Sequence, residues 1–549
     1  MNSAVIVLLA AAIYVAMYFT YGKSLQSKVV KADPNRPTPA HKLYDGVDYV
    51  PAHPLVLYGH HFASIAGAGP IVGPAVAMAW GWLPGLIWVW FGNVFIGAVH
   101  DYLALMSSVR YDGKSVQWIA GKLMSKRTGV AFELYIWFTL LLVVAAFVAV
   151  TAKLLTTTPE AATATLLFLV VAVLLGWMLY KMKMNFTVAT IIGLVLLAIS
   201  VWIGLNYPLV FVNLPVWVLL QPRDYLNAYI LWFGLLFGGI AFVLLAKDFT
   251  APAFTSWSAY VIKGTEAVPS PFWPTVPLVI ACGALSGFHS LVGSGTSSKQ
   301  LDNEIHGLLV GYGGMFTEGF LSTIVITAIA VYGVQLTGLE PAKWATEYIA
   351  KGGLGAFIGG YAKGVSEFYG VSETFGKTFA TLWVSAFTLT SLDTATRLGR
   401  FAWQELFGMV ADTSQGVWKI ITNKWLASII IAGLGTWLAW GAGYKVLWPA
   451  FAGMNQLLAS IAMMTGALWV AKVQRAGKWS WAVLLPALFL WITVTAGLIW
   501  YIAVVPLSGS TLIAVKGSLL VGLLLNFLLA WDFYIAWKKP EEEYAAAAA

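Results

Sequence analysis

Charge and cysteine are both scarce in this sequence. Only 10% of its 549 residues are Asp, Glu, Lys or Arg, whereas a soluble domain carries roughly 25%. So few charges cannot cover a water-facing surface, and the mean hydropathy of +0.78 agrees with this conclusion. The one cysteine, Cys282, lies in an apolar stretch. A single thiol excludes intrachain disulfides and cysteine-based metal or iron–sulfur clusters.

Further absences narrow the function. The sequence has no G-x-x-x-x-G-K-[ST] phosphate-binding loop and no loop long enough for a soluble catalytic domain. We therefore exclude an ATP-driven pump and predict neither an enzyme nor a cofactor. The net charge of +8 is spread over short loops, which indicates membrane topology and no nucleic-acid partner. Residues 1–20 lack a basic segment and a clear cleavage site, so they are predicted to be an uncleaved first helix.

Long apolar runs dominate what is present. A transmembrane helix needs about 20 predominantly apolar residues, and the 27 Trp and 23 Tyr fit aromatic belts at two membrane interfaces. We predict an all-α polytopic membrane protein with about 14–15 transmembrane helices. Fourteen runs of suitable length occur, near residues 2–20, 54–80, 85–108, 130–153, 164–180, 185–206, 226–247, 272–298, 305–335, 378–397, 425–441, 446–471, 481–505 and 512–537.

Basic residues set the expected orientation. Lys and Arg crowd the loops at 23–42 and 110–127, so both loops should be cytoplasmic and the N-terminus should lie outside. The same rule places the basic residues at 475–478 and 538–539 inside, but fourteen helices place them outside. One crossing is therefore miscounted. We expect an additional short or re-entrant span within 207–271.

An internal repeat supports that correction. The pattern F-x-S-x-x-G-x-G occurs at 62–69 and again at 288–295. With the additional crossing the two halves are inverted in the membrane, as in many secondary transporters; without it they are parallel. The predicted division is a first helix with its basic loop (1–53), a first repeat (54–206), a connecting segment with one or two spans (207–271), a second repeat (272–471), C-terminal helices (472–540) and a tail outside the fold (541–549).

Glycine and proline interrupt two hydrophobic segments, 59–75 and 286–300. Five such residues within eight positions cannot sustain a regular helix, so we expect a mid-membrane break in the first segment and a hydroxyl-rich copy of it in the second. Unwound backbone at that depth offers partial charges to ions and substrates; a packing stripe of glycines is the alternative. The predicted substrate-binding residues are Gly67, Gly69, Ser290, Gly293, Ser294, Gly295, Thr296, Ser297, Lys299 and Arg397.

Ionisable residues inside the spans are candidates for ion coupling, because each costs about 2.5 kcal/mol or more at the membrane centre. His100 and Asp101 are adjacent, and such a pair can relay a proton near neutral pH; a structural hydrogen-bonded pair is the alternative. Glu318 is the corresponding carboxylate of the second half. Asp393 and Arg397 have the i, i+4 spacing of an ion pair. The predicted proton- or ion-coupling residues are His100, Asp101, Glu318 and Asp393.

The histidines raise the question of a metal. His60, His61, His100 and His289 could converge with Asp101, and imidazole with carboxylate suits zinc or another transition metal. The sequence lacks the H-E-x-x-H pattern of a zinc site on one helix. Adjacent residues of a helix also point in different directions. A metal held by these four histidines therefore stays a minor alternative.

Several motifs match one family closely. In chain order they are HHFASIAGAGPIVGPA, GNVFIGAVHDY, RYDGKS, SGFHSLVGSGTSSKQL, GYGGMFTEGF, SLDTATRLGRF and WPAFAGMNQLLA, within residues 53 to about 470. They resemble the carbon-starvation protein A (CstA) family of bacterial inner-membrane transporters. The resemblance implies peptide uptake during carbon starvation, pyruvate import by proton symport in some relatives, and a LeuT/APC-like fold of inverted repeats with broken helices. The chain looks shorter at its C-terminal end than many relatives.

The prediction for function is a secondary active transporter of the bacterial inner membrane. It would import small peptides, or a short carboxylate such as pyruvate, driven by proton or sodium symport. A membrane nutrient sensor that binds such substrates without net transport is the alternative, and an intramembrane metalloenzyme is a third reading. The sequence leaves the substrate, the coupling ion and the oligomeric state open.

Overall fold

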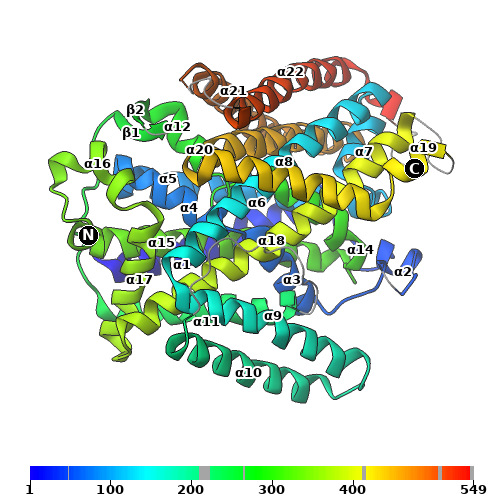
Figure 1. Ribbon diagram of the computed structural model, residues 1–549. Coiled ribbons are helices and arrows are strands. Elements are labelled where there is room, and N and C mark those ends of the chain that lie inside the picture. Colours follow the sequence, from blue (N-terminus) through cyan, green and yellow to red (C-terminus); the bar gives the residue numbers. More distant parts are fainter. Residues whose placement is uncertain (47, 209–222, 264–265, 411–415, 505–509, 545–549) are drawn as a thin grey trace.

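The computed structural model describes residues 1–46, 48–208, 223–263, 266–410, 416–504 and 510–544. Its helices form one bundle, with the two termini at opposite ends (Figure 1). The helices of the first half are α1 (Ser3–Met17), α2 (Pro39–Lys42), α3 (Pro54–Ala66), α4 (Gly69–Ala77), α5 (Trp82–Gly92), α6 (Ala98–Arg110), α7 (Val116–Leu123), α8 (Lys126–Thr157), α9 (Pro159–Tyr180), α10 (Phe186–Asn206) and α11 (Arg223–Leu245).

The second half begins with a two-stranded antiparallel hairpin, which is the exception to the predicted all-α fold. Its elements are β1 (Ser258–Lys263), β2 (Glu266–Pro271), α12 (Phe272–Val279), α13 (Gly287–Val292), α14 (Ser298–Gln300), α15 (Gly314–Thr337), α16 (Trp344–Lys351), α17 (Gly353–Tyr369), α18 (Glu373–Val410), α19 (Gly416–Ile421), α20 (Lys424–Leu468), α21 (Trp479–Val504) and α22 (Ser510–Lys538). Turns of π-helix continue several of them, among them η4 (Asn93–Gly97), η5 (Gly293–Ser297), η7 (Leu308–Gly313) and η9 (Trp469–Val473).

Polar residues start several of the apolar helices. The Ser125 hydroxyl accepts the backbone N–H of Thr128 at 3.1 Å, ahead of α8. The Asn185 side chain accepts the N–H of Thr187 at 3.0 Å, ahead of α10. Each cap satisfies one of the backbone donors that an α-helix leaves unpaired in its first turn.

The structure confirms a polytopic helical membrane protein, with fewer spans than expected. Nine helices of the described residues are long and apolar enough to cross a membrane, or ten if the bent pair α3–α4 counts as one span. Two shorter apolar helices, Tyr229–Leu245 and Lys424–Trp440, also match predicted runs. The predicted run at 378–397 lies inside α18, and the run at 272–298 is interrupted by non-helical backbone.

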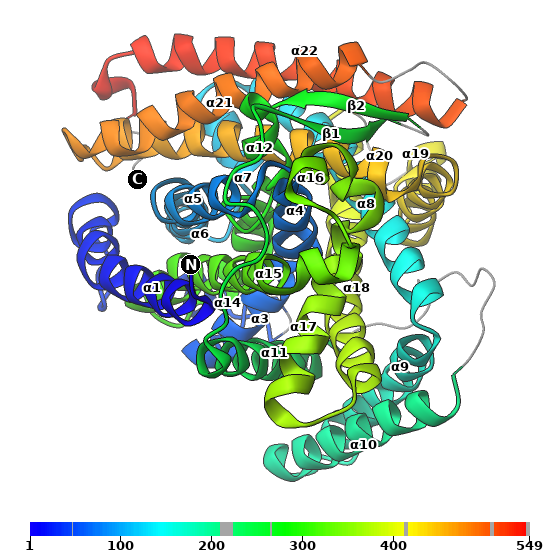
Figure 2. The same ribbon diagram turned by 90° about the vertical axis from the view of Figure 1, so that its left-hand side faces the viewer.

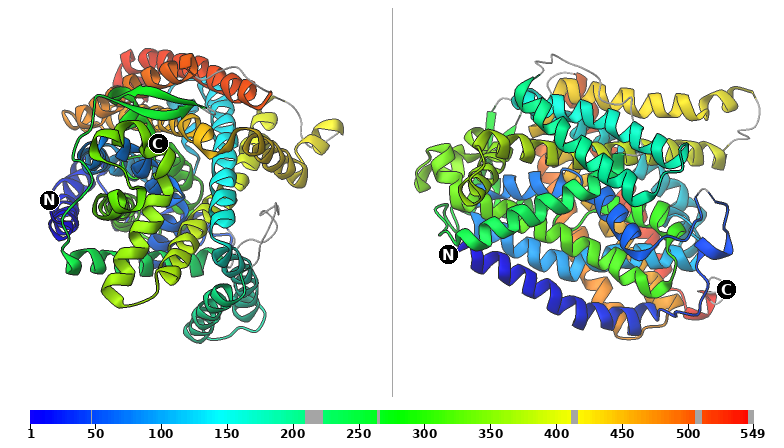
Figure 3. Two further views of the ribbon diagram at one scale, coloured as in Figure 1. Left: turned by 60° about the vertical axis from the view of Figure 1, so that its left-hand side comes forward. Right: turned by 90° about the horizontal axis from the view of Figure 1, so that it is seen from below.

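All the basic segments considered above lie at one end of the bundle. Lys31 Nζ donates to the Gln474 carbonyl at 2.7 Å, Arg110 donates to the Lys31 carbonyl at 3.1 Å, and Lys472 donates to the Lys539 carbonyl at 2.7 Å. By the charge rule this end is cytoplasmic. The N-terminus lies at the opposite, outer end, as expected (Figure 3).

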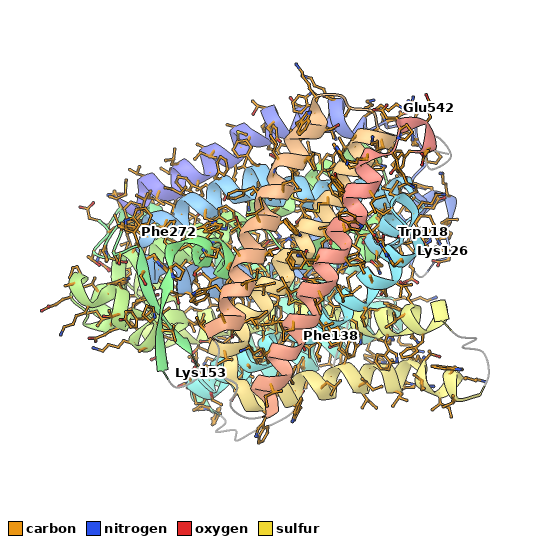
Figure 4. The ribbon with its side chains drawn as sticks, turned by 90° about the horizontal axis from the view of Figure 1, so that it is seen from above. Trp118, Lys126, Phe138, Lys153, Phe272 and Glu542 are labelled. Atoms are coloured by element: carbon orange, nitrogen blue, oxygen red, sulfur yellow. The ribbon has the colours of Figure 1, made fainter. Side chains whose placement is uncertain are left out.

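The directions of α10 and α11 can be compared with the expected additional crossing. Figure 4 shows Lys126 and Lys153 at opposite ends of α8, so α9 starts at the outer end. Gly204, near the end of α10, packs against Glu160 at the start of α9, and the segment after α11 pairs with Ser3 at the outer end. Thus α10 and α11 run the same way. The expected span at 210–220 lies outside the described residues, and the stretch after Asp248 forms the β1–β2 hairpin.

The two broken segments run in opposite directions. The N–H of Ala52, just ahead of α3, donates to the carbonyl of Gln300 at the end of α14 at 3.0 Å, so α3–α4 starts where α12–α14 ends. The far end of α4 reaches the outer segment, where Thr255 N–H donates to the Trp80 carbonyl at 3.1 Å. This antiparallel arrangement is that of the inverted alternative. Seen from the outer end, α9 and α10 project to one side and α21 and α22 cover another (Figure 2).

Candidate functional site

The first break lies where the sequence predicts it. Between α3 and α4, which are bent by 45°, Gly67 has φ of +40°, a conformation that favours glycine. A Cβ at Gly67 would lie 2.8 Å from the Ser391 hydroxyl and 2.9 Å from a ring carbon of Phe147. The alternative of a continuous helix with a packing stripe is therefore wrong here, although the glycine does pack closely.

The second break lies ahead of its predicted position. Residues 287–300 form the continuous helix α13–η5–α14, and the non-helical stretch is 280–286. The expectation of a break inside 286–300 is wrong because its serines and threonine bond back to the helix: Ser294 donates to the Ser290 carbonyl at 2.6 Å, and Thr296 donates to the Val292 carbonyl at 2.9 Å. Such bonds satisfy the hydroxyls within the helix.

Amide side chains hold the exposed backbone of the second break. Asn455 Nδ2 donates to the Ala281 carbonyl at 3.1 Å, Gln456 Nε2 donates to the Ile280 carbonyl at 2.8 Å, and Asn93 Nδ2 donates to the Gly283 carbonyl at 2.8 Å. These carbonyls have no helical partner, and an unpaired polar group in a membrane interior costs several kcal/mol. The three amides therefore stabilise the break.

The two breaks meet at the centre of the molecule. A Cβ at Gly69 would overlap the side chain of Cys282, and a Cβ at Gly73 would lie 2.6 Å from the Val279 carbonyl. Ser322 of α15 donates to the Pro70 carbonyl at 2.8 Å. The predicted site at Gly67 and Gly69 is thus bounded by the second break and closely packed.

A chain of four ionisable side chains lies beside the breaks. His100 Nδ1 and Asp101 Oδ1 are 2.8 Å apart, Asp101 Oδ2 and His289 Nδ1 are 2.8 Å apart, and His289 Nε2 lies 3.4 Å from Glu318 Oε2. All four are at most 1% exposed. They come from α6, α13 and α15, so the fold joins residues that are 188 and 217 positions apart.

Several atoms of these four side chains have no hydrogen-bond partner in the part of the chain that the structure describes. Within the described residues, both Glu318 oxygens and the Nε2 atoms of His100 and His289 make no hydrogen bond. In the described part of the structure, Asp101 and Glu318 form ion pairs with histidines alone. Two carboxylates compensated only by imidazoles need protons to approach neutrality, because an uncompensated buried charge is costly. The arrangement is suited to binding and moving a proton.

The predicted four-histidine metal site does not assemble. Among the described residues, the group whose ligating atoms lie within 4.8 Å of one another is Cys282, His289 and Glu318, so only one of the four histidines belongs to it. His61 Nδ1 instead lies 2.8 Å from the Ser297 hydroxyl. His100 and His289 both contact Asp101, but among the described residues the four imidazoles do not bring their ligating atoms to one common point.

Comparison with known proteins identifies the family to which this chain belongs. The family described as "Carbon starvation protein CstA" matches residues 2–209, 205–343 and 331–496. The chain belongs to this CstA family. It is 31% identical to the "Peptide transporter CstA" of Campylobacter jejuni, over 90% of this chain and 79% of that one. It is 30% identical to the protein of the same name from Bacillus subtilis, over 98% of both chains.

Another relative is named for a different substrate, pyruvate in place of peptides. The "Pyruvate/proton symporter BtsT" of Escherichia coli is 29% identical over 89% of this chain and 80% of its own. Among solved structures, a manganese transporter from Eremococcus coleocola has a TM-score of 0.45 and 12% identity, over 88% of this chain and 95% of that one. CstA membership makes this chain a membrane transporter of a family concerned with peptides, pyruvate and carbon starvation, and not an enzyme.

The other predicted substrate residues of this CstA protein lie toward the cytoplasmic end. Gly293 packs on Leu105 of α6, and Gly295 packs on Leu398 of α18. Ser290 donates to the Gly287 carbonyl at 2.7 Å. Lys299 is partly exposed, with its Nζ 5.5 Å from the ring centre of Tyr49. These residues line one helix leading from the central cluster to the cytoplasm.

The predicted ion pair on α18 forms. Arg397 Nη2 lies 2.9 Å from Asp393 Oδ2, with the arginine 33% and the aspartate 7% exposed. The pair lies on α18, whose Ser391 hydroxyl donates to the Ser64 carbonyl of α3 at 3.2 Å, so this helix contacts the first broken segment. Asp393 is thus engaged by an arginine and lies apart from the Asp101–His289–Glu318 chain, so the structure separates it from the other coupling candidates.

Sequence reasoning missed two kinds of residue. The amides Asn455 and Gln456 are adjacent in an apolar run. Two neighbouring amides in such a run could have been predicted to bind backbone carbonyls of a broken helix. Glu304 was not considered, although the structure makes it the centre of a cytoplasmic ion cluster. Its partners are 194 and 268 positions away, and no spacing rule reaches that far.

Proposed function

We propose that this chain is a proton symporter that imports small peptides, or a short carboxylate such as pyruvate, across the bacterial inner membrane. The observation that carries the proposal is the ring of His289, which lies between the carboxylates of Asp101 and Glu318 at the junction of the two breaks. The relatives named as peptide transporters and as a pyruvate/proton symporter support it.

The proton steps follow from the atoms of the chain. A proton from the outer side binds the Glu318 carboxylate, and the resulting acid donates to Nε2 of His289. Transfer to Nε2 gives an imidazolium between two carboxylates, which attract it strongly because all three side chains are buried. Loss of the Nε2 proton from the imidazolium to the cytoplasmic side returns His289 to the neutral ring, with Glu318 already ionised, and completes the cycle.

Substrate binding would be linked to these steps through the breaks. We place the substrate between the two broken segments, with Gly67 and Gly69 on one wall. Since Phe147 and Cys282 fill the space beside these glycines, entry of substrate must displace one broken segment from the other. The same displacement changes the surroundings of Glu318, because Ser322 on the same helix holds the Pro70 carbonyl. Movement of one bundle against the other would give alternating access.

The partly exposed cations Lys299 and Arg397 would assist at the cytoplasmic side. Both lie along the α13–η5–α14 face and could guide a carboxylate that leaves the central site; an arginine can do so by two parallel hydrogen bonds. In this role Asp393 competes with the substrate for Arg397, so the ion pair would limit how long the carboxylate stays bound.

The test is uptake of a labelled dipeptide and of labelled pyruvate into proteoliposomes. We expect accumulation of one of them above its external concentration under an inward proton gradient, and loss of accumulation when an uncoupler collapses the gradient. Accumulation that needs sodium and ignores the uncoupler would contradict proton coupling. Saturable binding without accumulation, in vesicles shown to be tight, would favour the sensor alternative.

A further inference from the structure

The Glu304 carboxylate is the centre of a compact ion cluster at the cytoplasmic end. Arg110 Nε lies 2.8 Å from Oε1 and Nη2 lies 3.0 Å from Oε2, which is a two-pronged contact. Arg36 Nη1 lies 3.2 Å from Oε2, and the backbone N–H of Asp33 donates to the same oxygen at 2.9 Å. Glu304 is 1% exposed. Its charge is therefore fully compensated.

The cluster holds a segment that we call the strap and define as residues 31–46 and 48–52. Asn303 Nδ2 donates to the Pro34 carbonyl at 3.1 Å, and His41 Nε2 lies 2.9 Å from Asp302 Oδ1. At its far end the strap pairs with the end of α14, through the bridge between Ala52 and Leu301. Many of its contacts thus fall on the segment that follows α14 and on residues 110–112 at the end of α6, and Lys31 also donates to the Gln474 carbonyl.

The strap connects the cytoplasmic ends of the two broken segments. It runs directly into α3, and its partners follow directly after α14. These helices are the cytoplasmic halves of the two broken segments, and between them lies His61 on Ser297. Any opening between α3 and α14 toward the cytoplasm must pull the strap away from residues 301–304.

We propose that the strap is an inner gate, latched by Glu304, that closes the cytoplasmic route to the His289 cluster. The proposal rests on the proposed transport function, whose alternating access requires such a gate. The two arginines that bind Glu304 lie on different sides of the proposed gate. Arg110 is 15% exposed and belongs to α6, whereas Arg36 is 40% exposed and belongs to the strap.

This division lets the gate open without leaving a buried charge unpaired. When the strap leaves, Arg36 and the Asp33 N–H go with it into water, and Arg110 keeps its two contacts with Glu304. Removal of one partner from a buried pair is strongly unfavourable, but here one arginine always stays. Opening therefore leaves the Glu304 carboxylate paired with Arg110, at the cost of the Arg36 and Asp33 contacts and of the Arg110 bond to the Lys31 carbonyl.

The native cysteine reports on the gate without further engineering. Cys282 is the one cysteine of the sequence, it is 3% exposed, and it lies between Gly69 and the His289–Glu318 pair. A charged, membrane-impermeant methanethiosulfonate reagent can reach it only through an open gate. The experiment compares the labelling rate from the cytoplasmic face in inside-out vesicles with the rate from the outer face in right-side-out vesicles.

We expect Arg36→Gln and Glu304→Gln to raise the cytoplasmic labelling rate of Cys282 at least tenfold and to leave the outer rate unchanged. Glu367→Gln is the matched control, because it breaks the ion pair with Lys247 at the outer end; it should not raise the cytoplasmic rate. Where Glu304→Gln fails to fold, Arg36→Gln alone decides, since its side chain is already partly in water.

An unchanged cytoplasmic rate in Arg36→Gln, or an equal rise from both faces, would overturn the gate. Should Cys282 react in none of the proteins, a Thr296→Cys reporter in a Cys282→Ser background is read in the same way, because Thr296 is partly exposed on η5 between Cys282 and the cytoplasm. Labelling needs neither substrate nor a proton gradient, so this result is independent of whether the transport proposal holds.

Discussion

Two buried glutamates, 14 positions apart, have opposite surroundings. Glu304 accepts hydrogen bonds from two arginines and a backbone N–H, whereas Glu318 faces one imidazole at 3.4 Å, with neither oxygen hydrogen-bonded among the described residues. A carboxylate saturated by arginine is fixed as an anion and holds structure together. A carboxylate beside histidine can exist with or without its proton. The comparison separates a latch from a coupling group, although in the sequence Glu304 directly precedes, and Glu318 lies within, the same apolar run at 305–335.

The largest effect should come from Glu318→Gln. The amide keeps the size of the side chain but cannot take up or release a proton, so gradient-driven accumulation should fall to the equilibrium level, a loss of tenfold or more. Exchange of labelled for unlabelled substrate should continue, because it needs no net proton movement. Uptake and exchange are measured in the same proteoliposomes, and persistent accumulation at the wild-type level would show that Glu318 is not the coupling group.

Asp101→Asn should have the next largest effect on transport and should also affect folding. The amide cannot compensate a protonated His289 or His100, both of which lie 2.8 Å from the Asp101 oxygens. Breaking a buried pair costs about 3–5 kcal/mol, so we expect a lower yield and a lower unfolding temperature together with uncoupled transport. Fully coupled uptake by a stable Asp101→Asn protein would remove Asp101 from the proton path.

Glu304→Gln should lower stability and keep gradient-dependent uptake, whereas Glu318→Gln should abolish gradient-dependent uptake. It leaves Arg110 and Arg36 without their anion, so we expect a loss of about 3 kcal/mol in stability and a leak of the cytoplasmic gate. Accumulation per folded molecule should still respond to the proton gradient. Thermal unfolding in detergent and uptake normalised to folded protein check this. Loss of gradient dependence with intact stability would show that the two glutamates do not differ as proposed.

Glu367→Gln should have the smallest effect. Its carboxylate pairs with Lys247 and accepts the Tyr332 hydroxyl at 2.7 Å, but it is 44% exposed at the outer end. Exposed pairs contribute about 1 kcal/mol or less, and increased salt should weaken the contribution further. Uptake rates should stay within twofold of wild type, and a large loss would mean that outer charges also take part in coupling.

The sequence predicted the central features that depend on local chemistry. Five glycines and prolines close together placed the first break at Gly67, and the cost of charge in a membrane singled out His100, Asp101 and Glu318. The disagreement between basic loops and helix number also led to an expected additional crossing within 207–271, which stays a prediction because residues 209–222 lie outside the described part of the chain. These inferences need only neighbouring residues and general properties of bilayers.

Contacts between residues far apart in the chain could not be predicted from the sequence. The bridging place of His289 depends on α13 lying against α6, and the latch at Glu304 depends on a strap from the first loop. The second break was misplaced because the glycines and serines at 286–300 look like loop residues, whereas their hydroxyls bond back along the helix. The supporting amides Asn455 and Gln456 belong to α20, more than 160 positions away from the break in the chain.

The most direct test of the account is proton flux measured with a pH dye inside proteoliposomes. On addition of the transported substrate outside, without an imposed gradient, wild-type protein should acidify the lumen as proton and substrate enter together. Glu318→Gln should give no acidification while still exchanging substrate. Equal acidification by wild type and Glu318→Gln would contradict the central claim that the His289–Glu318 pair carries the coupled proton.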